Sequence, residues 1–187
     1  RYIMIVFSEF PIDAERNSIL YDRVYENILN LKGIRHRVSI SGRRTEWNLH
    51  EQKIEEIDVL ISWVQSILPD VSKNFAGKTE ETRYRNYNEG GEPDYGYNLN
   101  SFEIAECWGV TYNKGEMLLE HNHFPYAISF IYYIRTPEGT APITIENETC
   151  EVKEGQCIFW LASNYHSVSV NDCDGRCAIV GNILYRF

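Results

Sequence analysis

Two histidines separated by one residue, His121 and His123, are the first residues of this 187-residue chain whose spacing indicates chemistry. They belong to segment 117–123, whose pattern predicts a β-strand, and the side chains of a strand alternate between its two faces. The two imidazoles are therefore expected on one face, where they can bind a metal ion together. Glu120 and Asn122 are expected on the opposite face, so neither is a natural third ligand. An H-x-H pair is a weak signal by itself, because most such pairs are surface or packing histidines.

A third histidine, His166, and an arginine ten residues later, Arg176, strengthen this interpretation. Both begin predicted strands, 166–170 and 176–185, and the Asp174-Gly175 turn signal between them predicts a hairpin. Their same-face neighbours are mostly small and apolar, so His166 and Arg176 are expected to point inward. An arginine inside a protein must meet an anion, and a guanidinium binds a carboxylate through two hydrogen bonds. A bound carboxylate ligand satisfies this need, and a buried ion pair with an acidic residue elsewhere in the chain is the alternative.

Short strands separated by turn residues must position these side chains. From Ser101 onward the pattern predicts eight strands, and regular short strands of this kind are typical of a β-sandwich or barrel. The expected strands are 103–112, 117–123, 127–135, 142–146, 149–152, 156–161, 166–170 and 176–185. The sequence therefore predicts a mainly β fold in the second half of the chain.

The first hundred residues have a different character. Residues 2–7 predict a buried strand, residues 13–31 a helix, and residues 48–68 an amphipathic helix that Pro69 ends. Residues 77–100 are rich in Asn, Gly and Tyr and predict a long surface loop, which can act as a lid or simply be mobile. We expect one compact domain, with residues 1–100 packing on a barrel core formed by residues 101–187.

Composition narrows the possible partners and the compartment. The formal net charge of −9 disfavours a nucleic-acid partner, and no apolar stretch is long enough to cross a membrane. The five cysteines, an odd number without a visible secretory signal, predict reduced thiols and a cytoplasmic location. Cys173 and Cys177 have the spacing of half a zinc site, but no second pair exists. We therefore interpret them as two cysteines of a hairpin.

Several motifs in the second half of the chain occur together at spacings typical of one enzyme family. They are Tyr112 to Gly115 followed after five residues by His121, the strand Ile131-Tyr132-Tyr133-Ile134, His166-Ser167-Val168 followed by Arg176, and Arg176 followed by Asn182. On these motifs, residues 108–187 resemble the 2-oxoglutarate- and Fe(II)-dependent oxygenases, particularly the prolyl-4-hydroxylase-like branch. The resemblance extends to a group of small, mostly uncharacterised members that also carry H-x-H at the metal motif.

The resemblance implies a double-stranded β-helix, which is a jelly-roll or cupin-like barrel. It also implies a catalytic Fe(II) site at His121, His123 and His166, with His123 in place of the family's usual carboxylate ligand. The sequence leaves open whether His123 binds the metal. The remaining roles that the resemblance implies concern the cosubstrate 2-oxoglutarate: Arg176 and Tyr133 would bind its distal carboxylate, Tyr112 would line its pocket and Asn182 would lie near the site.

The implied reaction consumes O2 and 2-oxoglutarate and hydroxylates an unactivated C–H bond, with release of succinate and CO2. The likeness to prolyl hydroxylases suggests a peptidyl or amino-acid-like substrate, which is an analogy at the level of the fold.

Two other functions remain open. Gly115 with His121 and His123 also matches the G-x5-H-x-H opening of the cupins, which suggests a three-histidine metal protein without 2-oxoglutarate. The glutamate that cupins carry a few residues later is absent, because Ala127 and Ile128 stand there. A jelly-roll binding protein without catalysis is the third hypothesis. The three differ in stoichiometry: one metal with 2-oxoglutarate, metal alone, or neither.

Overall fold

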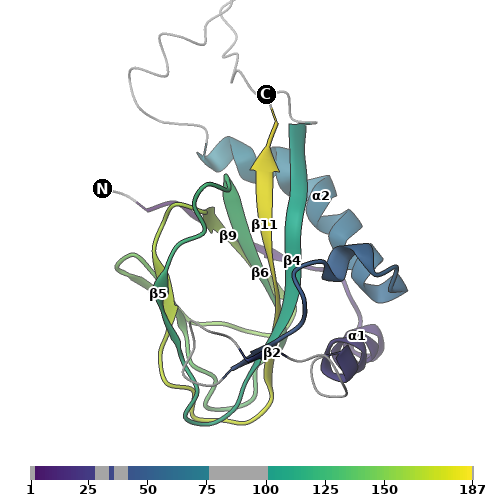
Figure 1. Ribbon diagram of the computed structural model, residues 1–187, viewed down its shortest axis with the longest axis vertical. Helices are drawn as coiled ribbons and strands as arrows, with labels where there is room; N and C mark the ends of the chain where they lie inside the picture. Colours follow the sequence, from purple (N-terminus) through teal and green to yellow (C-terminus); the bar gives the residue numbers. More distant parts are fainter. Residues whose placement is uncertain (1–2, 28–33, 36–41, 76–100, 187) are drawn as a thin grey trace, which may run out of the picture.

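Two antiparallel β-sheets face each other, and two helices cover the outer side of the larger sheet (Figure 1). The computed structural model describes residues 3–27, 34–35, 42–75 and 101–186. This arrangement confirms the expectation of a mainly β fold with N-terminal helices. The predicted loop at 77–100 lies outside the described residues, and the boundary at residue 100 stays a prediction.

The larger sheet has seven strands and joins both halves of the chain. Its first strand, β1, pairs with β9, so the N-terminal segment extends the sheet of the second half. The order across the sheet is β1 (Ile5–Glu9), β9 (Gln156–Leu161), β6 (Ile128–Arg135), β11 (Arg176–Tyr185), β4 (Phe102–Tyr112), β3 (Arg43–Arg44) and β2 (Ile34–Arg35).

The smaller sheet has four strands and closes the other side of the barrel. Its order is β5 (Leu118–His121), β10 (His166–Val168), β7 (Ile143–Ile145) and β8 (Glu148–Cys150). An apolar cluster fills the space between the sheets, with Ile143 and Val168 from the small sheet against Ile131 and Trp160 from the large one. This interior is where the candidate site lies.

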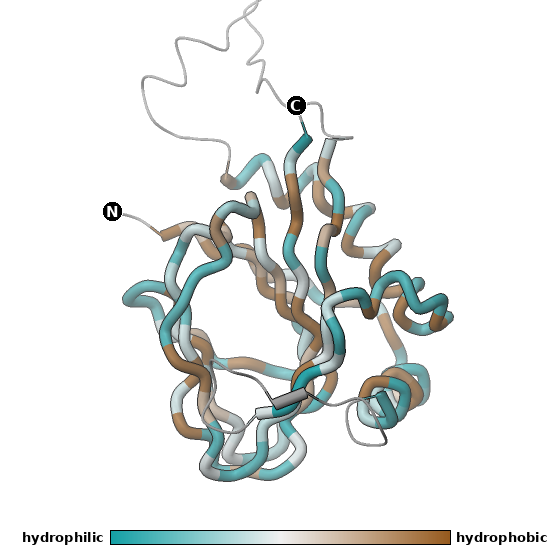
Figure 2. Tube along the Cα trace, viewed as in Figure 1, coloured by the Kyte–Doolittle hydropathy of each residue, from teal (hydrophilic) through white to brown (hydrophobic). Residues whose placement is uncertain are grey.

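Strand β6 shows how alternation builds two cores from one sheet. Phe130 and Tyr132 belong to the cluster beneath the helices, while Ile131 and Tyr133 belong to the cluster inside the barrel. Because both faces are covered, the strand is buried on both sides, and aliphatic and aromatic residues occupy most positions on both of its faces. Figure 2 shows the same pattern as apolar stretches along the strands of the large sheet.

The helices pack on the outer face of the large sheet. Helix α1 (Ala14–Asn27) buries Leu20 and Val24, and helix α2 (Glu55–Phe75) buries a stripe that begins at Ile57. Asn17 of α1 fixes the first helix to the sheet, because its side chain accepts a hydrogen bond from the Tyr132 hydroxyl at 2.8 Å.

Both predicted limits of the second helix are wrong. It begins at Glu55 rather than residue 48, because Lys53 adopts a left-handed conformation (φ 54°) that separates α2 from the short 3-10 turn Leu49–Glu51. It also continues past Pro69. Leu68 and Val71 are both buried in the same core, so packing on the sheet sustains the helix through a residue that lacks an N–H donor.

The predicted hairpin between residues 166 and 185 is also wrong. Strand β10 belongs to the small sheet and β11 to the large one, so the Asp174-Gly175 turn carries the chain from one sheet to the other. His166 and Arg176 nevertheless both line the barrel interior, each from its own sheet. Val170, which was expected to share the inward face, lies beyond the end of β10 and is exposed.

Three further observations concern the surface and the thiols. None of the described helices is long and apolar enough to cross a membrane. All five cysteines are outside disulfide bonds. Cys177 is buried beneath the helices, while the thiol of Cys173 lies beside the Thr140 hydroxyl and the Asn171 amide.

Candidate metal centre and its cavity

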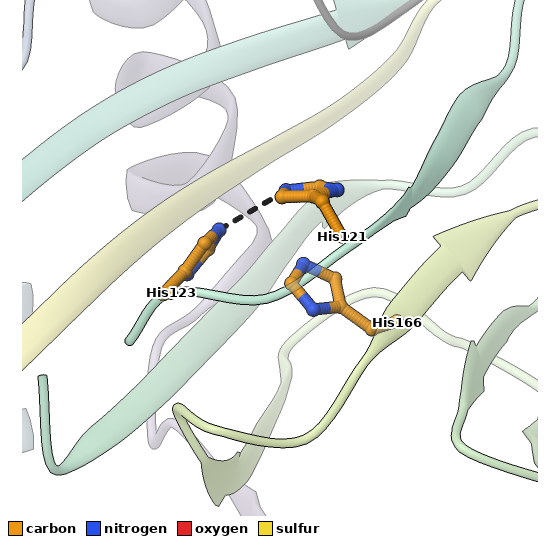
Figure 3. Close-up of side chains that lie close together, drawn as sticks. All are labelled: His121, His123 and His166. Atoms are coloured by element: carbon orange, nitrogen blue, oxygen red, sulfur yellow. Dashed lines mark hydrogen bonds between the residues drawn. The ribbon is translucent and has the colours of Figure 1, made fainter. Parts of the chain in front are cut away.

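Three histidines converge inside the barrel from two strands and one loop (Figure 3). His121 ends β5 and is the register partner of His166, which begins β10. His123 lies two residues beyond β5, and its backbone N–H donates to the carbonyl of Ala162 at 2.8 Å. The expectation that both histidines of the H-x-H pair lie within one strand is therefore wrong, but their rings still face the same space.

The three rings are close enough to share one metal ion. One nitrogen from each ring can be chosen so that all three lie within 4.8 Å of one another. The Nε2 atoms of His121 and His123 are 3.2 Å apart, and the ring centre of His166 is 4.4 Å from that of His121 and 4.7 Å from that of His123. Within the described part of the chain, the group contains no carboxylate.

The hydrogen bonds behind the rings determine which nitrogen of His121 and His123 carries the proton. Nδ1 of His121 lies 2.8 Å from the Leu119 carbonyl oxygen, which can only accept, so this Nδ1 carries the proton. Nδ1 of His123 lies 3.0 Å from the hydroxyl of Ser129, which itself donates to Asn182 Oδ1 at 2.9 Å. The Ser129 oxygen therefore accepts from Nδ1–H of His123.

This assignment leaves a lone pair on the Nε2 atom of both rings. Two lone pairs that face each other across 3.2 Å repel, and a proton or a metal cation beside them removes the repulsion. Burial favours the neutral rings that metal binding requires, because it lowers the pKa of His121 and, together with the neighbouring histidines, lowers the pKa of His166 well below its usual range. The donor set therefore fits a divalent transition metal ion.

A fully buried arginine lies in the same cavity. Arg176 has no exposed surface, and its Nη2 donates to the Tyr133 hydroxyl at 3.4 Å. The ring of Tyr112 lies 5.0 Å from the guanidinium carbon. Nε and Nη1 of Arg176 have no hydrogen-bond partner among the described residues. No described acidic side chain forms an ion pair with Arg176, so the alternative of an internal ion pair is not supported where the structure describes the chain.

The two tyrosines beside Arg176 keep their protons. Burial raises the pKa of Tyr133 to about 12, although the nearby guanidinium opposes this shift, and burial raises the pKa of Tyr112 as well. Both side chains are buried. The protonated Tyr133 hydroxyl can therefore donate a hydrogen bond to an anion that Arg176 binds.

The histidines and Arg176 line one cavity with apolar walls. Its empty volume is about 390 Å³, including open solvent at the mouth. Its remaining walls come mostly from aliphatic and aromatic residues of both sheets, among them Leu118, Ile131, Ile143, Trp160 and Val168. The indole N–H of Trp160 is buried and has no partner among the described residues. A small anion that also binds a metal matches this combination of groups.

A second hollow adjoins the first, and His121, His123 and Trp108 line both spaces. It has about 450 Å³ of empty volume and is lined by aromatic rings, one carboxylate and one amide. Phe124, in its wall, is 75% exposed. The members of this wall besides the histidines are Trp47, Glu106, Trp108, Phe124, Tyr126 and Asn182.

Sequence reasoning named the histidines, Arg176 and the tyrosines but missed two residues behind them. Ser129 is the one small polar side chain of β6, among aliphatic and aromatic residues and a terminal arginine, and this contrast was the available signal. Glu106 lies on β4 opposite Asn182, a pairing that no local pattern predicts. Asn182 itself lies six positions along β11 from Arg176 and bonds to these two residues.

Comparisons with known proteins identify the fold. No family model and no curated protein matches the sequence. Among solved structures, a Pseudomonas putida prolyl-4-hydroxylase is 12% identical with a TM-score of 0.69, and the match covers 99% of this chain and 94% of that one. The viral collagen prolyl hydroxylase from Paramecium bursaria Chlorella virus-1, solved as a 2-oxoglutarate complex, is 12% identical with a TM-score of 0.65, covering 96% and 94%.

A third similar structure belongs to an enzyme that is named for a different reaction. It is the non-haem α-ketoglutarate-dependent epimerase SnoN from nogalamycin biosynthesis, 11% identical with a TM-score of 0.67, covering 99% of this chain and 79% of that one. The chain therefore has the double-stranded β-helix fold of the 2-oxoglutarate- and Fe(II)-dependent oxygenases, as the sequence motifs predicted. At these identities the likeness defines the fold, and the chemistry has to be argued from the site.

Proposed function

We propose that this protein is an Fe(II)- and 2-oxoglutarate-dependent dioxygenase. In this proposal His121, His123 and His166 hold the iron, and Arg176 with Tyr133 binds the distal carboxylate of 2-oxoglutarate. The observation that carries the proposal is Arg176: a buried guanidinium with two partnerless nitrogens, in the same cavity as three convergent histidines. A buried charge of this kind requires an anion, and 2-oxoglutarate carries one carboxylate for the arginine and a keto acid for the metal.

The chain's own residues orient the cosubstrate and keep water away from it. Arg176 and the protonated Tyr133 hydroxyl hold the far carboxylate, and the aromatic ring of Tyr112 closes that end of the cavity. The aliphatic walls exclude water from the metal side. Fe(II), with 2-oxoglutarate and O2, supplies the oxidising chemistry that hydroxylates a C–H bond and releases succinate and CO2.

The second hollow is the proposed position of the prime substrate. It shares His121 and His123 with the cosubstrate cavity, so a group bound there lies next to the proposed metal site. Its wall of aromatic rings suits a ring or an alkyl side chain. We propose a peptidyl or amino-acid-like substrate, because two of the similar structures are named as prolyl hydroxylases.

We further propose that the protein works in a reducing, cytoplasm-like compartment. The support is that all five cysteines are outside disulfide bonds.

The test is succinate formation by the purified protein with Fe(II), 2-oxoglutarate and ascorbate under air, together with calorimetry of 2-oxoglutarate binding. Arg176→Met should abolish 2-oxoglutarate binding, since it removes the charge and all five N–H donors while keeping a long side chain. Arg135→Met is the matched control, because Arg135 stacks on Tyr21 of helix α1 and does not line the cavity.

The outcomes separate the three functional hypotheses. Binding of 2-oxoglutarate to the metal-loaded protein, lost in Arg176→Met and kept in Arg135→Met, supports the oxygenase. Metal binding without 2-oxoglutarate binding favours a three-histidine cupin. Binding of neither one favours a jelly-roll protein without catalysis.

A further inference from the structure

A half-buried carboxylate, Glu106, lies behind the histidine that replaces the family's usual carboxylate ligand. The Asn182 amide donates to Glu106 Oε2 at 2.9 Å, and Asn182 Oδ1 accepts from the Ser129 hydroxyl at 2.9 Å. Ser129 in turn lies 3.0 Å from His123 Nδ1. These three hydrogen bonds form an unbroken chain, defined here as the Glu106 relay, from a carboxylate to the imidazole of His123.

The direction of each bond in the relay follows from its carboxylate end. Glu106, when ionised, only accepts, so Asn182 must present its NH2 group to Glu106 and its carbonyl oxygen to Ser129. The hydroxyl proton of Ser129 is then committed to Asn182, and the Ser129 oxygen must accept from His123. The relay therefore holds the proton of His123 on Nδ1 and directs the Nε2 lone pair toward His121.

The structure around the Glu106 relay favours its three hydrogen bonds over alternatives with water or with a charged side chain. Ser129 and Asn182 are both buried, so water does not readily replace either partner. A β-bulge follows Asn182 in its pairing with β4, and bulges often redirect side chains next to active sites. Among the described residues, Glu106 forms no ion pair with a lysine or arginine. Arg44 lies near enough to attract Glu106 electrostatically without forming an ion pair with it, so no direct partner neutralises the negative charge of Glu106 there.

We propose that Glu106, through Asn182 and Ser129, positions His123 as the third metal ligand and supplies the negative charge that a direct carboxylate ligand would bring. This inference rests on the proposed metal and cosubstrate sites. Three neutral histidines do not offset the two positive charges of Fe(II). The cosubstrate 2-oxoglutarate adds two negative charges and Arg176 adds one positive charge, which leaves one positive charge in total. The charge of Glu106 makes the formal total zero, which is also the total for two histidines and one carboxylate.

The experiment compares Zn(II) binding by the wild type, Glu106→Gln and Glu103→Gln, measured by competition with a chromophoric chelator at fixed pH and ionic strength. Glutamine keeps the shape of Glu106 and an acceptor for Asn182 but removes the charge. Glu103→Gln is the matched control, because it removes the same charge from the same strand, where Glu103 pairs with Arg186. Partners behind metal-binding histidines are typically worth about 10- to 100-fold in affinity.

We expect Glu106→Gln to weaken Zn(II) binding by about tenfold or more and Glu103→Gln to change it less than twofold. At saturating Zn(II), the affinity of Glu106→Gln for 2-oxoglutarate should be equal to or tighter than that of the wild type, because the centre is one charge more positive. General damage to the site would weaken both affinities together. In Zn(II)-loaded protein labelled with 15N-histidine, His123 should show a proton on Nδ1 whose resonance shifts in Glu106→Gln.

The other possible results would contradict either the Glu106 relay or the proposed metal site. Equal Zn(II) affinities in all three proteins, or a His123 that carries its proton on Nε2, would overturn the relay. A parallel loss of Zn(II) and 2-oxoglutarate affinity in Glu106→Gln would overturn it as well. A wild-type protein that binds no Zn(II) would overturn the proposed metal site itself.

Discussion

Replacing Arg176 by methionine should make the ligand-free protein more stable while abolishing 2-oxoglutarate binding. The guanidinium is fully buried, and two of its nitrogens have no partner among the described residues. A buried unsatisfied polar group costs about 1–3 kcal/mol, and replacing buried charges by well-packed apolar groups often stabilises a protein by about 1–4 kcal/mol. We therefore expect a gain of about 2 kcal/mol in the free energy of unfolding, which is about 4–8 °C in Tm for a chain of this size.

The assay is thermal unfolding of the wild type and Arg176→Met, each with Zn(II) and with and without 2-oxoglutarate. At one hundred times its Kd, the cosubstrate should stabilise the wild type by about 2.7 kcal/mol and leave Arg176→Met unchanged. Arg135→Met should shift Tm little, because Arg135 only stacks on Tyr21. An Arg176→Met protein that loses about 2 kcal/mol or more and still responds to 2-oxoglutarate would refute the reasoning, because Arg176 would then have a structural partner.

Three further predictions concern the scaffold. Gly181→Ala should destabilise the protein by about 1–3 kcal/mol in chemical denaturation, because an added Cβ would lie 2.3 Å from the Phe130 ring; an unchanged midpoint would contradict this. Pro69→Ala should raise the free energy of unfolding by about 1–3 kcal/mol, because α2 already runs through this position and regains a backbone hydrogen bond; a lower midpoint would show that the proline ring is needed. The folded-state pKa of Tyr133, about 12, lies above its ordinary value of 10, so the stability from the neutral phenol is full below pH 10 and is lost as pH rises toward 12. Urea unfolding at pH 9 and pH 11 should therefore show a smaller loss for Tyr133→Phe than for the wild type, and equal losses would contradict the assignment.

Length and flanking turn residues made the long central strands of the large sheet predictable, whereas β1 is Ile5–Glu9 rather than 2–7, and β2 and β3 were not predicted. Strands β9 and β11 begin and end where the pattern predicted, and β6 differs by one residue at its start. Within β11, the inward set that begins at Arg176 follows from the side-chain period of two and needs no knowledge of the partner strands. The inward direction of Arg176, and therefore its need for an anion, could be predicted from the sequence alone.

Pairing between strands was less predictable, because it depends on how the barrel closes. A turn signal such as Asp174-Gly175 is the same whether the next strand pairs with its predecessor or crosses to the other sheet. The structure takes the second route, so His166 and Arg176 line the cavity from two sheets. The sequence prediction that both side chains point inward agrees with the structure, although the hairpin used to argue it is wrong.

The proposed metal site depends on contacts that cannot be predicted from residue spacing. His123 lies outside β5, so strand alternation does not orient its ring. Its backbone bond to Ala162 and the hydrogen bond from its Nδ1 to Ser129 do so instead. Ser129 is the one small polar side chain of β6, it is buried, and a buried hydroxyl requires a partner. The polarity of Ser129 was a signal that something polar lies opposite, but only the folded chain shows that its partners are His123 and Asn182.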